Sequence, residues 1–247
     1  MRMLIALAVV AVGCNRKPET KASPQYFHVD PATASSVKGK VRLEGKRPAA
    51  KRIRMDAEEA CQALHKEPVF EEKVLVTKDG GLANVFVYVK EGLEGKVFPP
   101  AETAVVLEQR GCQFVPRVMG IRAAQTLAVK NSDPVSHNIH PMPKNNRDWN
   151  QQQPPQAPDL QRRFARAEVM IPVKCNVHNW MRSYIGVLDH PFFAVTDADG
   201  GFSLEGLPPG SYTLAAWHES FGEITQPLVV ASSEPRSTEF VFSGKTP

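Results

Sequence analysis

Long apolar runs are scarce in this sequence of 247 residues. The longest, Leu4 to Val12, is too short for a membrane-spanning helix, which needs about 20 residues. The chain also lacks a glycine-rich phosphate loop, a G-x-S-x-G nucleophile turn and the dinucleotide fingerprint G-x-G-x-x-G. Its net charge of +4 is small, and its basic residues form no nucleic-acid-binding motif. These absences argue against nucleotide-dependent enzymes, serine hydrolases and nucleic-acid partners, and we expect no enzymatic activity.

The short apolar run has the features of an export signal. Arg2 precedes it, and it ends in a small residue followed by Cys14. The sequence "AVGC" resembles the bacterial lipobox, in which the cysteine becomes the lipid-modified first residue of the mature protein. The resemblance implies a lipoprotein with a signal peptide, exported to the periplasm or cell surface and held at the membrane through Cys14. The alternative is an ordinary cleaved signal in which Cys14 has no role.

Only four cysteines are present, and an oxidising compartment allows some of them to pair. With Cys14 assigned to lipid and Cys175 to the loop described below, Cys61 and Cys112 remain, and we expect a disulfide between them. A cross-link closing a loop of about 50 residues contributes on the order of 4 kcal/mol to stability by the chain-entropy relation. Two buried free thiols, or a metal site that uses Cys61 and His65, are the alternatives.

Turn residues punctuate short alternating apolar runs along most of the chain, and this pattern predicts an all-β protein. The stretch "DGGFSLEGLPPGSYTLAAW" at 199–217 resembles the carboxypeptidase-regulatory-like domains, which have a transthyretin-type sandwich and are usually non-catalytic. We divide the chain into five parts: a lipoprotein signal peptide at 1–14, a flexible tether at 15–36, an N-terminal β segment at 37–102, a second β domain at 103–189 that contains the loop described next, and a carboxypeptidase-regulatory-like β-sandwich at 190–247.

The stretch "CNVHNWM" brings three metal-binding side chains into one connection between two apolar strands. These are Cys175, His178 and Met181. Thiolate and thioether favour Cu(I) and imidazole also suits Cu(II), so the set fits a blue-copper site of two histidines, one cysteine and a weak methionine. The missing histidine is available upstream in "SHNIH", as either His137 or His140. These two point to opposite faces of a strand, so only one is expected to bind.

The two stretches "NSDPVSHNIH" and "CNVHNWM" resemble the cupredoxin family, and the Cys-x2-His-x2-Met spacing is that of the amicyanin type of ligand loop. The resemblance covers about residues 112–188. It implies a Greek-key β-sandwich, one type 1 copper that alternates between Cu(I) and Cu(II), and the ligands His137, Cys175, His178 and Met181. It also implies that Asn138 steadies the ligand loop. The family's loop histidine lies near the surface, so we expect electrons to enter at His178 and the neighbouring Trp180.

The sequence therefore favours a lipid-anchored copper protein that carries single electrons between redox proteins, whose identity it does not specify. Copper storage or delivery is an alternative, for which His140 and Met142 are the only additional ligands nearby. A metal-free structural or carbohydrate-binding β module is a second alternative. A copper enzyme is disfavoured because it needs an open coordination position or a second copper site, and no further histidine-rich motif is present.

Overall fold

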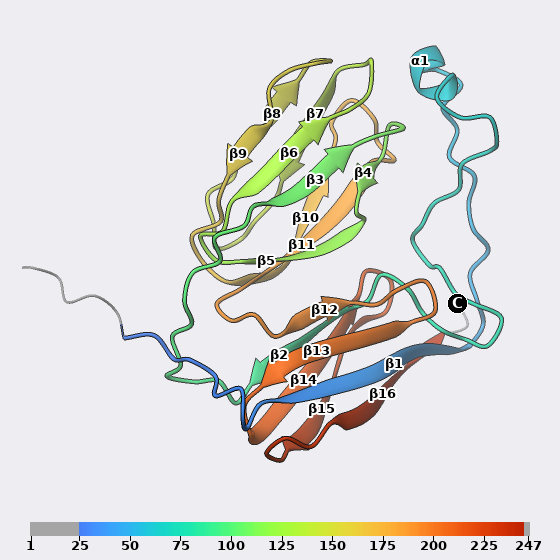
Figure 1. Cartoon of the computed structure of the whole chain (residues 1–247). Helices are drawn as coiled ribbons and strands as arrows, with labels where there is room; N and C mark the ends of the chain where they lie inside the picture. Colours follow the sequence, from blue (N-terminus) through green and yellow to red (C-terminus); the bar gives the residue numbers. More distant parts are fainter. Residues whose placement is uncertain (1–24, 245–247) are drawn as a thin grey trace, which may run out of the picture.

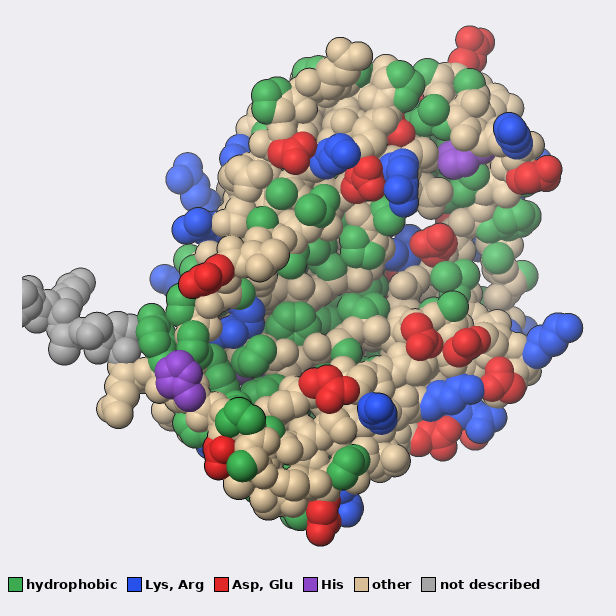
Figure 2. All heavy atoms as spheres, in the orientation of Figure 1, with side chains coloured by type: hydrophobic (Ala, Val, Ile, Leu, Met, Phe, Trp, Pro, Cys, Tyr) green, Lys and Arg blue, Asp and Glu red, His purple; other side chains and the backbone are tan. Residues whose placement is uncertain are grey.

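The computed structural model describes residues 25–244 and confirms the all-β prediction. The predicted signal peptide, Cys14 and the first part of the predicted tether lie outside the described residues. Within the described range, no helix is long and apolar enough to cross a membrane. The strands form four sheets, which Figure 1 shows as two stacked β-sandwiches. In Figure 2, acidic and basic side chains are interspersed over both sandwiches on the face shown.

The first sandwich contains the strands that carry the predicted metal ligands. Its five-stranded sheet has the order β5-β11-β10-β7-β8, and its four-stranded sheet has the order β4-β3-β6-β9. The strands are β3 (Val105–Gln109), β4 (Phe114–Val115), β5 (Val118–Arg122), β6 (Leu127–Asn131), β7 (His137–Pro141), β8 (Gln151–Gln153), β9 (Leu160–Arg162), β10 (Glu168–Lys174) and β11 (Arg182–Leu188). Alternate apolar residues of the strands meet in one buried core, which includes Leu107, Ile121 and Ile185.

The second sandwich combines strands from both ends of the chain. Its sheets have the orders β13-β1-β16 and β12-β2-β14-β15. The strands are β1 (Ser35–Gly45), β2 (Phe86–Glu91), β12 (Phe193–Val195), β13 (Gly201–Leu207), β14 (Gly210–His218), β15 (Gly222–Val230) and β16 (Arg236–Gly244). The structure does not set the predicted N-terminal β segment at 37–102 apart as a sheet of its own. Its strands β1 and β2 pair with strands of 190–247, because those strands alone leave sheet edges and apolar faces uncovered.

The two sandwiches pack together through a small aromatic and aliphatic cluster. Phe86 lies at its centre and contacts residues of β5, β11 and β14. Gly120 and Gly186 allow the close approach, since a Cβ on Gly186 would lie 2.5 Å from the Phe86 ring. Arg117 and Glu219 add a buried ion pair across the same junction, with one N–O distance of 2.9 Å. The relative position of the sandwiches is thus fixed by packing.

A long excursion between β1 and β2 extends from the second sandwich to the far end of the first (Figure 1). We call residues 46–74 the cap segment. Its two arms pair with each other, since the Ile53 amide donates to the Val69 carbonyl at 2.8 Å. Its tip is the short helix α1 (Glu59–Gln62), whose N-cap residue Glu58 makes no side-chain capping hydrogen bond. The disulfide predicted between Cys61 and Cys112 is present and ties this tip to the first sandwich.

Candidate metal centre

Two neighbouring strands of the five-stranded sheet bring the predicted ligands together. His137 begins β7, and β7 pairs with β10 so that Lys174 lies opposite His140. Cys175 directly follows β10 and begins the ligand loop, and Met181 ends that loop just before β11. Within the loop, the Met181 amide donates to the His178 carbonyl at 3.0 Å and the Cys175 amide donates to the Met181 carbonyl at 3.3 Å. These bonds close the loop into a tight turn beside His137.

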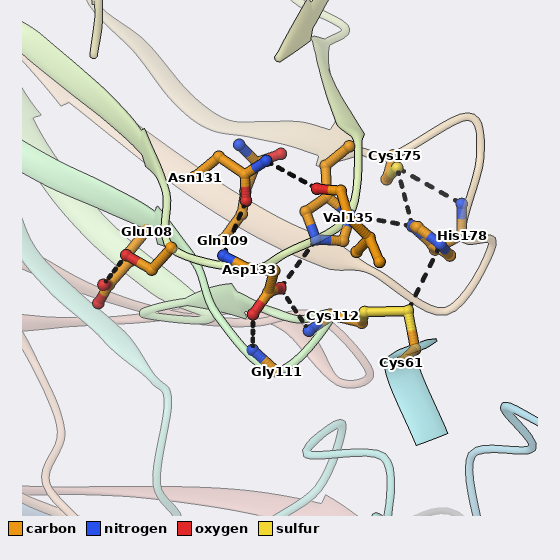
Figure 3. Close-up of polar contacts among 12 residues, drawn as sticks. Cys61, Glu108, Gln109, Gly111, Cys112, Asn131, Asp133, Val135, Cys175 and His178 are labelled. Atoms are coloured by element: carbon orange, nitrogen blue, oxygen red, sulfur yellow. Dashed lines mark hydrogen bonds and ion pairs between the residues drawn. A yellow bond between two sulfur atoms is a disulfide. The ribbon is translucent and has the colours of Figure 1, made fainter. Parts of the chain in front are cut away.

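The polar atoms of three predicted ligands converge on one point in the core. The Nδ1 atoms of His137 and His178 are 3.0 Å apart, and the Cys175 Sγ lies 3.7 Å from the His178 Nδ1. All three side chains are buried, with at most 2% of each exposed. Figure 3 shows Cys175 and His178 facing one another at the end of the first sandwich.

These separations fit a single metal ion. Nitrogen and sulfur ligands lie about 2.0 and 2.3 Å from a bound ion, so tetrahedral ligands are separated by about 3.3 Å for two nitrogens and about 3.5 Å for nitrogen and sulfur. The observed 3.0 and 3.7 Å are close to both values. Two imidazoles and one thiolate are the donor set of a blue-copper site. The residues present therefore fit a copper ion better than Ca²⁺ or Mg²⁺, which prefer oxygen ligands.

Met181 and Asn138 occupy supporting positions around this point. Met181 is 1% exposed and belongs to the same buried cluster as Cys175. The Asn138 amide lies 3.5 Å from the Cys175 Sγ, and its side-chain oxygen accepts from the Asn176 amide in the ligand loop. Asn138 thus joins β7 to the loop, which is the place expected for a residue that steadies it. His140 instead lies beside Asn176 and Asp148, outside the convergence of ligands.

Asp133 is a functional candidate that the sequence reasoning missed. Its carboxylate lies 2.8 Å from the His137 Nε2 and accepts the backbone amides of Gly111 and Cys112 at 2.6 and 2.7 Å. Burial opposes ionisation, but the bonds from His137 and these two amides outweigh it and lower the pKa of Asp133. The carboxylate holds the His137 proton on Nε2, which leaves Nδ1 free for a metal. The available signal was an acidic residue four positions before the histidine.

The surrounding contacts prepare Cys175 and His178 for metal binding, whereas His137 must lose a proton from Nδ1 when a metal binds. Burial alone favours the neutral thiol of Cys175, but hydrogen bonds from His137 and from backbone amides of the loop lower its pKa. Burial disfavours a charged His137, yet Asp133 and Cys175 raise the pKa of this histidine. Burial and the nearby His137 lower the pKa of His178. The arrangement therefore favours a thiolate at Cys175 and a neutral imidazole at His178, which are the forms that bind metals.

The structure corrects the expected exposure of His178. Only 2% of this side chain is exposed, because the tip of the cap segment covers it. The Cys61 Sγ lies 3.5 Å from the His178 Nε2, and a carboxylate oxygen of Glu58 lies 3.9 Å from the same nitrogen. Trp180 packs against His178 with ring centres 5.2 Å apart and remains partly exposed. Of the two residues expected to admit electrons, only Trp180 reaches the surface.

Solved structures similar to part of this chain include several copper proteins. A copper-containing nitrite reductase from Thermus scotoductus SA-01 is 17% identical with a TM-score of 0.33, and the similarity covers 40% of this chain and 24% of the reductase chain. A point mutant of amicyanin in its Cu(I) form is 17% identical with a TM-score of 0.31, covering 35% of this chain and 84% of amicyanin. A purple cupredoxin from Nitrosopumilus maritimus is 17% identical with a TM-score of 0.29, covering 35% and 99%. No family model matches the chain, and no curated protein matches it.

Proposed function

We propose that this protein holds one copper ion in the first sandwich and carries single electrons between redox partners. The observation that supports this proposal is the convergence of the His137 Nδ1, the His178 Nδ1 and the Cys175 Sγ on one buried point. Bound copper would supply the one-electron couple Cu(II)/Cu(I). His137, Cys175 and His178 would hold the ion, and Met181 would be a weaker fourth ligand.

The chain's own residues limit how much this site changes during an electron exchange. The short loop is closed by its own backbone bonds, and Asn138 ties it to β7. Asp133 fixes the ring of His137 from the other side. A ligand set held in this way reorganises little when an electron is added or removed, so the protein environment favours fast exchange over bond-making chemistry.

Trp180 is the proposed contact between the site and a redox partner. Its indole packs against His178, and its Nε1–H donates to the Cys112 carbonyl at 2.9 Å. It also lines a cavity of about 280 Å³ together with Met181 and Arg182. A partner that reaches this cavity would meet the Trp180 ring, which packs against His178, and Met181 on the same wall. Replacement of Trp180 by Leu is expected to slow oxidation of the Cu(I) form by a macromolecular oxidant, measured by stopped-flow.

Export and lipid anchoring at Cys14 form part of the same proposal. The buried Cys61–Cys112 disulfide supports an oxidising compartment, because such bonds are rare where thiols are kept reduced. The anchor itself would be tested by mass spectrometry of the mature protein, which would detect acyl chains on Cys14. An unmodified N-terminus formed by cleavage elsewhere would contradict the anchor and leave the copper proposal unaffected.

The visible spectrum of the full chain after addition of Cu(II) tests the copper proposal directly. The expected result is one copper per chain and an intense thiolate-to-copper charge-transfer band that ascorbate bleaches. A Cys175→Ser variant should lack the band, and a His140→Ala variant is the matched control that should retain it. Folded protein that binds no copper, or binds it without the band, would refute the electron-transfer proposal. In that case, rapid transfer of bound Cu(I) to a chelator would favour storage or delivery.

A further inference from the structure

We propose that the Cys61–Cys112 cross-link serves the metal centre as an access control, because it holds the cap segment over the outer edge of His178. The cap segment would then keep water and small anions away from this ligand. The site would exchange electrons without taking up an external ligand. This inference deepens the copper proposal above and rests on it for its functional meaning, but the cap itself is tested without any metal.

The contacts at His178 show how the Nε2 side of its ring is shielded from water. An imidazole that binds a metal through Nδ1 presents its Nε2 on the opposite side of the ring, and this nitrogen would ordinarily meet water. Here the Nε2 faces the Cys61 Sγ at 3.5 Å and a carboxylate oxygen of Glu58 at 3.9 Å. Figure 3 shows the disulfide lying directly against His178, with α1 behind it. The covering atoms therefore come from a part of the chain more than 100 residues away in sequence.

The cap segment has little else to hold its tip in place. The helix α1 is only four residues long, has no side-chain cap and buries only one of its own residues, Cys61. Ile53 and Met55 pack into the core of the first sandwich before the tip, and after the tip one hydrogen bond joins the His65 ring to the Gly111 carbonyl at 2.8 Å. Such a short helix is not stable by itself. The covalent bond to Cys112 is therefore the main restraint on the atoms that cover His178.

The Cys112 end of the disulfide is hydrogen-bonded to residues that contact the predicted ligands. The Cys112 amide donates to Asp133, which holds His137, and the Cys112 carbonyl accepts from Trp180, which packs against His178. Cys112 is completely buried. One end of the disulfide is thus fixed by the residues that surround the ligands, and the other end carries the cover. The disulfide therefore contacts the residues around the ligands directly, unlike a disulfide that only stabilises the fold from a distance.

Chemical modification of histidines in the metal-free protein tests the cap. Diethyl pyrocarbonate acylates accessible neutral imidazoles, and peptide mass spectrometry reports the rate at each histidine. Wild-type protein should show a very slow reaction at His178. The Cys61→Ala/Cys112→Ala double variant should react at least about tenfold faster there, because the tip of the cap segment can then open locally. His140, whose side chain is partly exposed beside Asp148, is the reference that should react equally in both proteins.

A second buried histidine serves as the folding control. His218 is 1% exposed and lies in the second sandwich, so its reaction reports general unfolding. A rise at His178 with His218 still protected supports the cap. A wild-type rate at His178 in a double variant with protected His218 overturns it. Should His218 also react, Met55→Ala decides the question, because this change keeps the cross-link and removes a packing contact between the cap segment and the core of the first sandwich. A wild-type rate at His178 in this variant supports the proposal, and a rise at His178 with His218 still protected overturns it, because packing and not the cross-link would then hold the cover.

The copper-loaded protein provides a separate readout. Azide should leave the visible spectrum of the wild-type Cu(II) form unchanged and should alter that of the double variant, because the anion can then reach the site. If the protein binds no copper, the azide experiment gives no result, but the labelling of the metal-free protein still tests the cap. Equal labelling of both proteins would overturn the cap and leave the copper site standing. The two proposals can therefore fail independently.

Discussion

Replacement of Asp133 by asparagine tests how this carboxylate affects the stability, the Cu(II) affinity and the reduction potential of the proposed metal centre. The carboxylate is 5% exposed and accepts three hydrogen bonds, from the His137 ring and from the amides of Gly111 and Cys112. Asparagine is nearly the same size but has one oxygen acceptor, and its NH₂ group can only donate. The variant therefore removes the negative charge and leaves at least one buried N–H without an acceptor, while it preserves the packing.

The expected magnitudes follow from these contacts. A hydrogen bond to a charged group is worth about 1.5–3 kcal/mol, and a buried unsatisfied donor costs about 1–3 kcal/mol. We expect the free energy of unfolding of the metal-free variant to fall by on the order of 3 kcal/mol. Loss of a group that orients a metal-binding histidine typically weakens metal affinity by about 10–100-fold. The carboxylate makes the imidazole a stronger electron-pair donor to the metal, and this matters more for Cu(II) than for Cu(I). The variant should therefore lose affinity mainly for Cu(II). The reduction potential should then rise by roughly 60–120 mV.

Two measurements on purified protein check this prediction. Chemical denaturation of the metal-free chain gives the change in unfolding free energy, and competition with a chelator together with a redox titration gives Cu(II) affinity and potential. Asp148→Asn is the matched control. It removes the same charge from the same sandwich, but its carboxylate is 65% exposed and faces only His140, so it should change stability by less than about 0.5 kcal/mol. A folded Asp133→Asn protein with wild-type Cu(II) affinity and potential would refute the reasoning.

Three further predictions concern the two-sandwich framework. Phe86→Ala should lower the unfolding free energy by about 3–5 kcal/mol, measured by denaturation, because it empties the centre of the junction. Arg117→Met should cost on the order of 3 kcal/mol in the same assay, because it strands the buried Glu219 carboxylate. Burial lowers the pKa of His218 to about 4. The unfolded chain then binds a proton at this residue more readily between about pH 6.5 and 4, so the contribution of His218 to the unfolding free energy should fall by about 1.4 kcal/mol for each unit by which the pH is lowered through this window. His218→Phe should reduce this slope by one proton, and an unchanged slope would refute the assignment.

The fold class and the local ligand spacing could be predicted from the sequence because both depend on near neighbours. Alternation of apolar residues and turn signals reports strands directly. The loop that holds Cys175, His178 and Met181 closes on itself within seven residues, so its chemistry is visible in one short stretch. The pairing of Cys61 with Cys112 followed from counting cysteines in a chain expected to be exported, and the structure confirms it.

The division into domains could not be predicted in the same way. The strands β1 and β16 pair along nine residues although about 200 residues separate them in the chain. Alternating patterns show that a strand has one buried face, but they do not show which strand lies beside it. The sequence therefore does not show which strands pair with those of 37–102, and only the structure shows that this segment completes the second sandwich.

The sequence by itself determined that the protein is built of β-strands, that it carries one cysteine, two histidines and a methionine in an order suited to copper, and that two further cysteines can pair. Only the tertiary structure decided which surroundings those ligands have. It placed Asp133 against His137, covered His178 with the cap segment more than 100 residues away in the sequence, and left Trp180 at the surface. These outcomes depend on packing between distant segments, because burial and hydrogen-bond partners are set by the whole fold and not by neighbouring residues.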